Sequence, residues 1–185
     1  MSKDKKNKLY FFKTLKILVI SAFLAGMSIV FGKYLAINVG EYLRFGFENT
    51  PIILAGIIFG PLVGGVVGAV ADLLGCLAVG YAINPLITVG AATIGFVSGL
   101  SSIIMDKLFR TPLILRVAIP TVLAHIIGSL IIKTIGMHIY YTIDLSVLFL
   151  WRALNYVIIA PLDTAVIYFL LRSKALQAQI NSIKG

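Results

Sequence analysis

The chain has 185 residues, of which 59% are hydrophobic and only 12% are charged. Soluble domains carry about 45–50% apolar and about 25% charged residues, so this composition excludes a soluble globular domain, a disordered chain and a nucleic-acid-binding module. A transmembrane helix needs about 20 apolar residues, and the apolar content suffices for about five or six such spans. The sequence therefore predicts a single all-α integral membrane domain.

The N-terminal segment 1–13 is basic and is followed by a long apolar run. This run is longer than the apolar region of a cleaved signal peptide, about 7–15 residues, so we expect a retained first span at 14–34. A polar segment at 35–50 follows it. No further soluble domain is expected, because the apolar runs occupy nearly all of the remaining chain.

Six spans are predicted, and proline residues mark where some of them begin. Proline fits the first turn of a helix but breaks a helix interior, so the apolar run after Pro51 divides at Gly60 and Pro61. The predicted spans are 14–34, 51–59, 61–79, 86–105, 113–135 and 147–171. A nine-residue helix covers only about 14 Å, less than the roughly 30 Å hydrocarbon core, so the second span must lean on its neighbours or extend backwards.

The distribution of basic residues predicts the orientation. Six spans place both termini on one side, and twelve of the 16 Lys and Arg residues lie on that side. The other four are Lys33, Arg44, Lys133 and Arg152. Because Lys and Arg collect on the cytoplasmic side, both termini are predicted to be cytoplasmic, and the net charge of +9 indicates orientation instead of a nucleic-acid partner.

Asp72 lies near the middle of its predicted span, at the end of a row of small residues at four-residue spacing. The row consists of Gly56, Gly60, Gly64 and Gly68, and small residues let helices approach closely. A carboxylate at a helix centre costs roughly 2.5–3.5 kcal/mol on insertion scales, so it is normally buried against a partner. Asp72 is therefore either an interhelical hydrogen-bond anchor or a ligand group.

His125 lies near the middle of the span 113–135. A lone histidine among apolar residues is more often structural than a ligand group, and its depth would let it pair with Asp72. Asp163 is expected to be structural or to face a partner subunit. Since no second histidine or carboxylate follows at metal-ligand spacing, no metal site and no cofactor are expected, and the single Cys76 excludes an intramolecular disulfide.

The last span opens with a polar face. Arg152, Asn155 and Tyr156 fall at helical spacing on one side, which suits a ligand. The alternative, an interfacial aromatic belt with a snorkelling arginine, explains Trp151 and Arg152 but not Asn155.

Two predicted external loops add groups that suit a flat, anionic ligand. Arginine is a natural bidentate partner of a carboxylate, and aromatic side chains stack on flat rings. No phosphate-binding loop or metal-ligand spacing is present, so an enzyme is not expected. The candidate substrate-binding residues are Arg44, Phe45, Phe47, Asn49, Asp72, Tyr81, Asn84, His125, Arg152, Asn155 and Tyr156.

The run from Leu43 to Gly75 resembles the substrate-binding S components of energy-coupling factor (ECF) vitamin transporters. Its most specific part is the pattern G-x-x-x-G-P-x-x-G-x-x-x-G-x-x-x-D, which ends at Asp72. The resemblance covers the whole chain and is greatest for the folate-specific members (FolT-type). It implies the six-helix S-component (RibU/ThiT-like) fold, with both termini in the cytoplasm, as a multi-pass protein of the bacterial cytoplasmic membrane.

The resemblance also implies partners. S components carry no ATPase and associate with a transmembrane coupling protein and two cytoplasmic ATPase subunits that energise them in trans. Their first span typically docks through an alanine-x-x-x-alanine face, in place of which this chain has two small-residue pairs. These pairs are Ser21 with Ala25 and Ala22 with Gly26.

Folate is the ligand that the resemblance implies. Its anionic glutamate tail suits Arg44 or Arg152, and its pterin edge suits Asp72, Asn84 or Asn155. We expect the pterin to lie deepest, with the tail pointing outward. The alternatives are an S component for thiamine or riboflavin, and a structural membrane protein without a ligand.

Overall fold

The computed structural model describes residues 3–39, 43–108 and 111–184, with side chains described over 14–37, 45–108 and 111–183. The described chain is almost entirely helical, which confirms the predicted fold class. Its elements are α1 (Lys3–Ile29), the π-helix η1 (Val30–Tyr34), β1 (Ile37–Val39), β2 (Leu43–Phe45), α2 (Asn49–Phe59), α3 (Pro61–Val79), α4 (Pro85–Leu108), α5 (Leu113–Ala124), the π-helix η2 (His125–Lys133), α6 (Thr134–Tyr141), α7 (Leu145–Arg172) and α8 (Lys174–Lys184).

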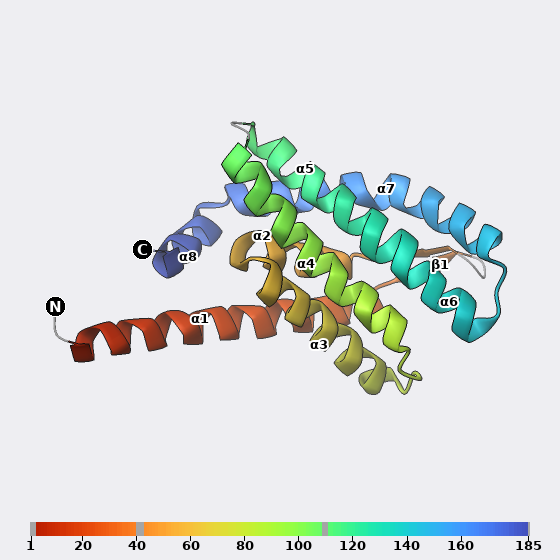
Figure 1. The fold of residues 1–185 in the computed structure, drawn as a ribbon, viewed down its shortest axis with the longest axis horizontal. Helices are drawn as coiled ribbons and strands as arrows, with labels where there is room; N and C mark the ends of the chain where they lie inside the picture. The colour runs from red at the N-terminus through yellow and green to blue at the C-terminus, as the bar shows by residue number, and fades with distance from the viewer. Residues whose placement is uncertain (1–2, 40–42, 109–110, 185) are drawn as a thin grey trace.

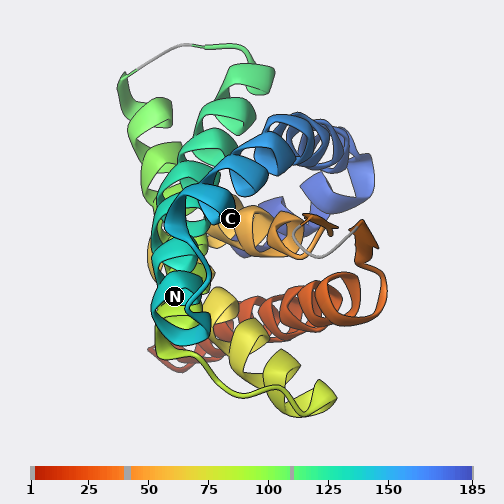
Figure 2. The same cartoon turned by 90° about the vertical axis from the view of Figure 1, so that its right-hand side faces the viewer.

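Five helical stretches are long and apolar enough to cross a membrane, and α2 is a sixth, shorter apolar helix. α2 begins at Asn49 and is buried along nearly its whole length. Figure 2 shows α2 in the middle of the bundle, with α1, α7 and the α4–α6 helices around it. Its neighbours therefore cover a helix too short to span a bilayer alone.

A turn at Gly60 separates α2 from α3. Gly60 has φ of 92°, a conformation that glycine adopts without a steric penalty, and Pro61 is the first residue of α3. The proline and glycine residues thus end one helix and begin the next, as the sequence indicates.

The small-residue row packs α2 and α3 closely against α4. A Cβ atom added at Gly68 would lie 2.1 Å from the carbonyl oxygen of Ala91. Cβ atoms added at Gly56 and Gly64 would lie 2.4 and 2.5 Å from the carbonyl oxygen of Gly95. No side chain fits at these distances, so the prediction that the row serves helix packing is confirmed at Gly56, Gly64 and Gly68. Gly60 is the exception, because a Cβ there would meet nothing within 4 Å.

Three features differ from the sequence-based boundaries. The helix that begins at Leu113 continues to Tyr141, six residues beyond the predicted 113–135. Glycine often follows the end of a helix, but Gly136 lies within α6. It packs against Leu86, and a Cβ added at Gly136 would lie 2.8 Å from the Leu86 Cβ. The polar C-terminal tail forms α8 because Leu176 and Ile180, one helical turn apart, pack against the core.

The third difference is a short hairpin in the first long loop. β1 and β2 pair antiparallel, with Ile37 opposite Phe45. Neither strand is predicted, since each is only three residues long.

Both termini lie at the same end of the molecule (Figure 1). The β1–β2 hairpin and the α6–α7 connection lie at the opposite end, which we call the loop end. An even number of spans requires this arrangement of the termini. That the termini face the cytoplasm stays a prediction from the basic residues.

Candidate functional site

A cavity of about 620 Å³ lies at the loop end of the bundle. Small-molecule sites typically occupy about 300–1,000 Å³, so its size suits a vitamin-sized ligand. Residues of α1, η1, α2, α3, α4, η2, α6 and α7 line it, together with the loop between α3 and α4. Its polar lining residues are Ser28, Lys33, Glu48, Asn49, Asp72, Cys76, Tyr81, Asn84, Lys133, Tyr141, Arg152, Asn155 and Tyr156.

Seven of the predicted substrate-binding residues come together in this lining. They are Asn49, Asp72, Tyr81, Asn84, Arg152, Asn155 and Tyr156. Three helices (α2, α3 and α7) and the α3–α4 loop supply them, so only the tertiary fold brings them within reach of one ligand.

The other four predicted residues are not among the residues that line the cavity. Phe45 is half-buried in β2, and Phe47 is exposed beside it. His125 is buried behind Tyr156, with the two ring centroids 4.8 Å apart. The Arg44 side chain lies outside the described side chains, although its backbone pairs with Asn38 in the hairpin.

Three charged residues that line the cavity were not predicted: Lys33, Glu48 and Lys133. The distribution of basic residues nevertheless pointed to the two lysines. Lys33, Lys133 and Arg152 are three of the four basic residues on the side that the charge rule leaves poor in Lys and Arg. Charged groups within membrane segments usually mark a functional site. The basic residues that do not follow the cytoplasmic bias of Lys and Arg were therefore candidates for the site.

Arg152 is held by neutral acceptors. Its Nη2 donates to the Ser129 carbonyl oxygen at 3.0 Å and to the Tyr156 hydroxyl at 3.2 Å, and its Nη1 lies 3.2 Å from the Met137 sulfur. Its Nε has no hydrogen-bond partner among the described residues. The guanidinium is thus positioned by the protein without being neutralised by a described carboxylate, which suits an anionic ligand group.

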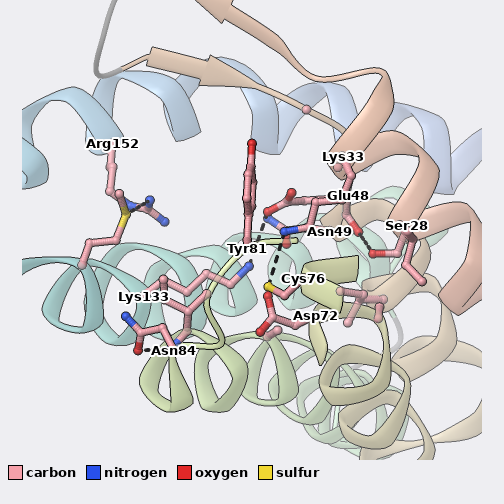
Figure 3. Close-up of a pocket in the computed structure, with 18 of the residues that line it drawn as sticks. Ser28, Lys33, Glu48, Asn49, Asp72, Cys76, Tyr81, Asn84, Lys133 and Arg152 are labelled. Carbon is pink, nitrogen blue, oxygen red and sulfur yellow. Dashed lines mark hydrogen bonds and ion pairs between the residues drawn. The ribbon is translucent and has the colours of Figure 1, made fainter. Parts of the chain in front are cut away.

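Lys33 contributes a second cation. Its Nζ lies 3.7 Å from the Cys76 Sγ and 5.3 Å from the centroid of the Tyr81 ring. Figure 3 shows Tyr81 between Lys33 and Arg152, which lie on opposite sides of the view. The two cations therefore belong to different parts of the cavity.

Lys133 is paired within the protein. Its Nζ lies 3.5 Å from the Glu48 Oε1, and only 8% of its side chain is exposed. The Glu48 carbonyl oxygen accepts a hydrogen bond of 2.7 Å from the Ser28 Oγ. A Cβ on Gly32 would lie 2.5 Å from the Glu48 Oε2, so glycine at this position makes room for the carboxylate.

Asp72 is an interhelical hydrogen-bond anchor, and its position is also compatible with a ligand group. Its Oδ2 accepts a hydrogen bond of 2.6 Å from the Thr88 Oγ1, which links α3 to α4. Asp72 also lines the cavity. Because only one carboxylate oxygen serves this link, the residue can also accept hydrogen bonds from a ligand.

Asn84 holds the α3–α4 loop in place. Its Oδ1 accepts from the backbone amides of Leu86 at 3.0 Å and Ile87 at 3.4 Å, which caps α4. Its Nδ2 donates to the Gly136 carbonyl oxygen at 3.1 Å. The amide therefore joins the start of α4 to α6 at the edge of the cavity.

Asp144 caps α7, the helix that carries Arg152, Asn155 and Tyr156. Its side chain accepts from the Ser146 amide at 2.8 Å and the Ser146 hydroxyl at 2.7 Å. These bonds from Ser146 are the main reason why the pKa of Asp144 lies below its ordinary value. The start of α7, and with it the register of its polar face, is thereby fixed.

The predicted pairing of His125 with Asp72 is wrong. The His125 Nε2 lies 2.8 Å from the Asp163 Oδ2, and both side chains are almost fully buried. Asp163 also accepts a hydrogen bond from the Thr50 hydroxyl. His125 faces α7 and not α3, which explains why its partner is Asp163 and not Asp72. The contacts of Asp163 with His125 and Thr50 fit the expectation that Asp163 is structural.

The two predicted docking pairs on α1 face different ways. Ala25 is buried in the core, at 6% exposure, and Ser21 is half-buried. Ala22 and Gly26 are exposed, and a Cβ on Gly26 would meet nothing within 4 Å. The Ala22–Gly26 pair is therefore the one that lies open on the surface of α1.

Comparisons with known proteins identify the family. Residues 12–177 match the family model for the ECF-type riboflavin transporter, S component. The chain is 31% identical over 157 residues to the folate transporter FolT of Clostridium novyi (strain NT), which covers 84% of this chain and 88% of that protein.

Solved structures share the fold. The crystal structure of FolT bound with folic acid matches with a TM-score of 0.65 at 25% identity, over 83% of this chain and 90% of that chain. The S component for biotin from an ECF-type ABC transporter matches with a TM-score of 0.64 at 14% identity, over 97% and 99% of the two chains. The chain therefore belongs to the S components of ECF-type transporters, multi-pass membrane proteins that bind a transported substrate and are not enzymes.

Proposed function

We propose that this chain binds folate in the loop-end cavity as the substrate-specific subunit of an ECF-type importer. The observation that carries the proposal is the Arg152 guanidinium, held in the cavity by neutral acceptors with its Nε unpaired among the described residues. Folate carries carboxylates on its glutamate tail, and charge-assisted hydrogen bonds between an arginine and a carboxylate are among the strong ones. The likeness to two FolT proteins supports the same ligand.

The pterin ring binds at the other part of the cavity. Asp72 accepts hydrogen bonds from the N–H groups of the pterin edge, and the Lys33 ammonium donates to the pterin carbonyl oxygen. Lys33 reaches this region because its partner Cys76 lies one helical turn after Asp72. Tyr81 supplies a ring face for stacking. Asp72 lies in the middle of α3 and Arg152 near the start of α7, so the tail points towards the loop end.

Charge also discriminates among vitamins. Among the described lining residues, three cations (Lys33, Lys133 and Arg152) stand against two carboxylates, Glu48 and Asp72. Thiamine is itself a cation and would add to the positive excess. Riboflavin, the second candidate because the family model is described for it, is uncharged and leaves Arg152 without an anion, which costs about 1–3 kcal/mol for an unsatisfied buried group.

The partners follow from family membership. We infer that the chain docks on a transmembrane coupling protein through the exposed Ala22–Gly26 face of α1, while two ATPase subunits energise transport. Small residues at this spacing permit close helix–helix contact in a membrane. With the termini in the cytoplasm, the cavity opens to the outside.

A panel of vitamins tests the proposal. Purified protein is titrated by isothermal calorimetry with folic acid, riboflavin, thiamine and biotin under the same conditions. We expect saturable one-to-one binding of folic acid and at least about tenfold weaker binding of riboflavin and thiamine, which leave the Arg152 cation unpaired. Biotin carries a carboxylate but lacks the pterin ring assigned to Asp72 and Tyr81, so it should also bind at least about tenfold more weakly. Preferential binding of riboflavin, or binding of none of the four, contradicts the proposal.

A further inference from the structure

A closed ring of polar contacts lies behind the cavity and joins α2, η2 and α7. The Arg152 Nη2 donates to the Tyr156 hydroxyl at 3.2 Å. The Tyr156 ring lies against the His125 ring, with centroids 4.8 Å apart. The His125 Nε2 is 2.8 Å from the Asp163 Oδ2, and the other oxygen of Asp163 accepts from the Thr50 hydroxyl.

The ring closes through Asn49 and Ser129. Asn49, the residue before Thr50, donates from Nδ2 to the Ser129 Oγ at 3.4 Å. The Ser129 carbonyl oxygen accepts from the Arg152 Nη2 at 3.0 Å. Each element of the ring is therefore tied to the other two, and a change at one point alters the geometry at the rest.

Only part of this ring reaches the cavity. Asn49, Tyr156 and Arg152 line it. His125 is 1% exposed and Asp163 is fully buried, and neither lines the cavity. A histidine and an aspartate at this depth are costly to insert, and their mutual bond alone does not explain why His125 also lies against the tyrosine that accepts from Arg152.

We propose that the His125–Asp163 pair is a positioning unit for ligand recognition. It fixes the Tyr156 ring, the Tyr156 hydroxyl then orients the Arg152 guanidinium, and the pair thereby determines affinity for the ligand's carboxylate without touching the ligand. Networks of this kind are rigid because each hydrogen bond is strengthened in a low-dielectric interior. The inference rests on the proposed function, since it assumes an anionic ligand group at Arg152.

The competing view is that the pair only joins helices. In that case its removal lowers the stability of the protein without a specific effect on ligand affinity. The two views differ in one measurable quantity, the dependence of the His125 effect on Arg152.

A double-mutant cycle measures that dependence. The affinity for folic acid is determined for the wild type, His125→Ala, Arg152→Gln and the double variant, with thermal unfolding recorded for each. We expect His125→Ala to weaken binding about tenfold in the wild-type background and less than about twofold when Arg152 is already replaced, because residues linked in one network couple by such amounts. Thr121→Val is the matched control: Thr121 is fully buried one turn earlier and donates only to the Val117 carbonyl oxygen, so its affinity should equal that of the wild type.

A second variant keeps the test informative if His125→Ala does not fold. Tyr156→Phe retains the ring against His125 and removes only the hydroxyl that accepts from Arg152, so it should weaken binding to a similar extent and be equally non-additive with Arg152→Gln. An effect of either variant that is as large without Arg152 as with it, or no larger than that of Thr121→Val, overturns the positioning role.

The wild-type titration separates this inference from the proposed function. If the wild type does not bind folic acid, the proposed function fails. If the wild type binds folic acid but the loss caused by His125→Ala is equal in both Arg152 backgrounds, the proposed function stands and only the positioning role is overturned.

Discussion

At the scale of single residues, the cavity contains charged groups with distinct tasks. Lys133 and Glu48 neutralise each other across the boundary between η2 and α2. Arg152 and Lys33 instead have neutral neighbours among the described residues. A binding site for an anionic ligand needs such unneutralised cations, because a cation already paired with a carboxylate gains little from a second one.

Replacement of Asp72 is expected to weaken ligand binding. Asp72→Asn replaces a carboxylate oxygen with an NH₂ group and should weaken folic acid binding about tenfold, because hydrogen bonds to charged groups are worth about 1.5–3 kcal/mol. Calorimetric titration measures the loss. Asp106→Asn is the control, since Asp106 pairs with Arg116 at 3.1 Å near the end of α4 distant from the cavity. Equal affinities of the two variants would contradict a role for Asp72 in ligand binding.

Residue types that are rare in a membrane were the most predictable part of the site. Asp72, Arg152 and Asn155 stand out in the sequence because a polar group in an apolar span needs a reason. Lys33 and Lys133 were missed because each lies near a predicted span end, where lysine ordinarily snorkels to the interface. The pairing of His125 with Asp163 was missed because depth alone does not show which faces of two helices meet.

At the scale of elements, two π-helical segments place functional side chains. η1 carries Lys33, and η2 begins at His125 and ends at Lys133. π-helical turns often occur at functional sites, and the wider turn changes which residues face the bundle interior. The sequence shows only an apolar periodicity here, so neither segment was predictable from it, whereas the break at Gly60 and Pro61 was.

The contact between α3 and α4 supports a prediction of stability. Gly68→Ala places a Cβ 2.1 Å from the Ala91 carbonyl oxygen, which forces the helices apart and should cost about 1–3 kcal/mol of unfolding free energy, as overpacking does. Thermal unfolding in detergent measures the effect.

Gly65→Ala is the matched control on the same helix. Its Cβ would lie 3.4 Å from the nearest atom, the Ala92 carbonyl oxygen, which is close to ordinary contact. Its melting temperature should equal or slightly exceed that of the wild type, since alanine favours helix over glycine. A Gly68→Ala protein as stable as Gly65→Ala would show that the two helices do not pack as described.

At the scale of the whole molecule, the cavity and the exposed small-residue pair of α1 lie on different parts of the bundle. The cavity and its charged lining belong to the loop end, while the exposed small-residue pair Ala22–Gly26 lies along α1 on the bundle surface. The six apolar helices were predictable from composition, and the family from the resemblance of the glycine pattern to known S components. The convergence of seven predicted residues on one cavity needed the tertiary fold, because these residues are spread from position 49 to position 156.

The surface of α1 can be tested without disturbing the cavity. Gly26→Trp adds a large side chain at a position where even a Cβ meets nothing, so folic acid binding by the purified subunit should be unchanged. Close approach of a coupling protein should be blocked, and cellular folate uptake should fall to background. Ala78→Trp, at an exposed position of α3, is the control and should transport normally; normal uptake by Gly26→Trp would contradict docking at this face.

Whether Arg152 holds the carboxylate of the ligand can be decided by comparing two ligands that differ in the glutamate tail. The affinities of the wild type, Arg152→Gln and Arg172→Gln are measured for folic acid and for 6-hydroxymethylpterin, which lacks the glutamate tail. Arg172 is a matched control because it donates to the hydroxyl of Tyr168, four residues earlier, at the other end of α7. We expect Arg152→Gln to lower the affinity for folic acid at least about tenfold and to change the affinity for the pterin little. Arg172→Gln should leave both affinities unchanged. Unchanged folic acid affinity in Arg152→Gln, or equal losses for the two ligands, would contradict this role of Arg152.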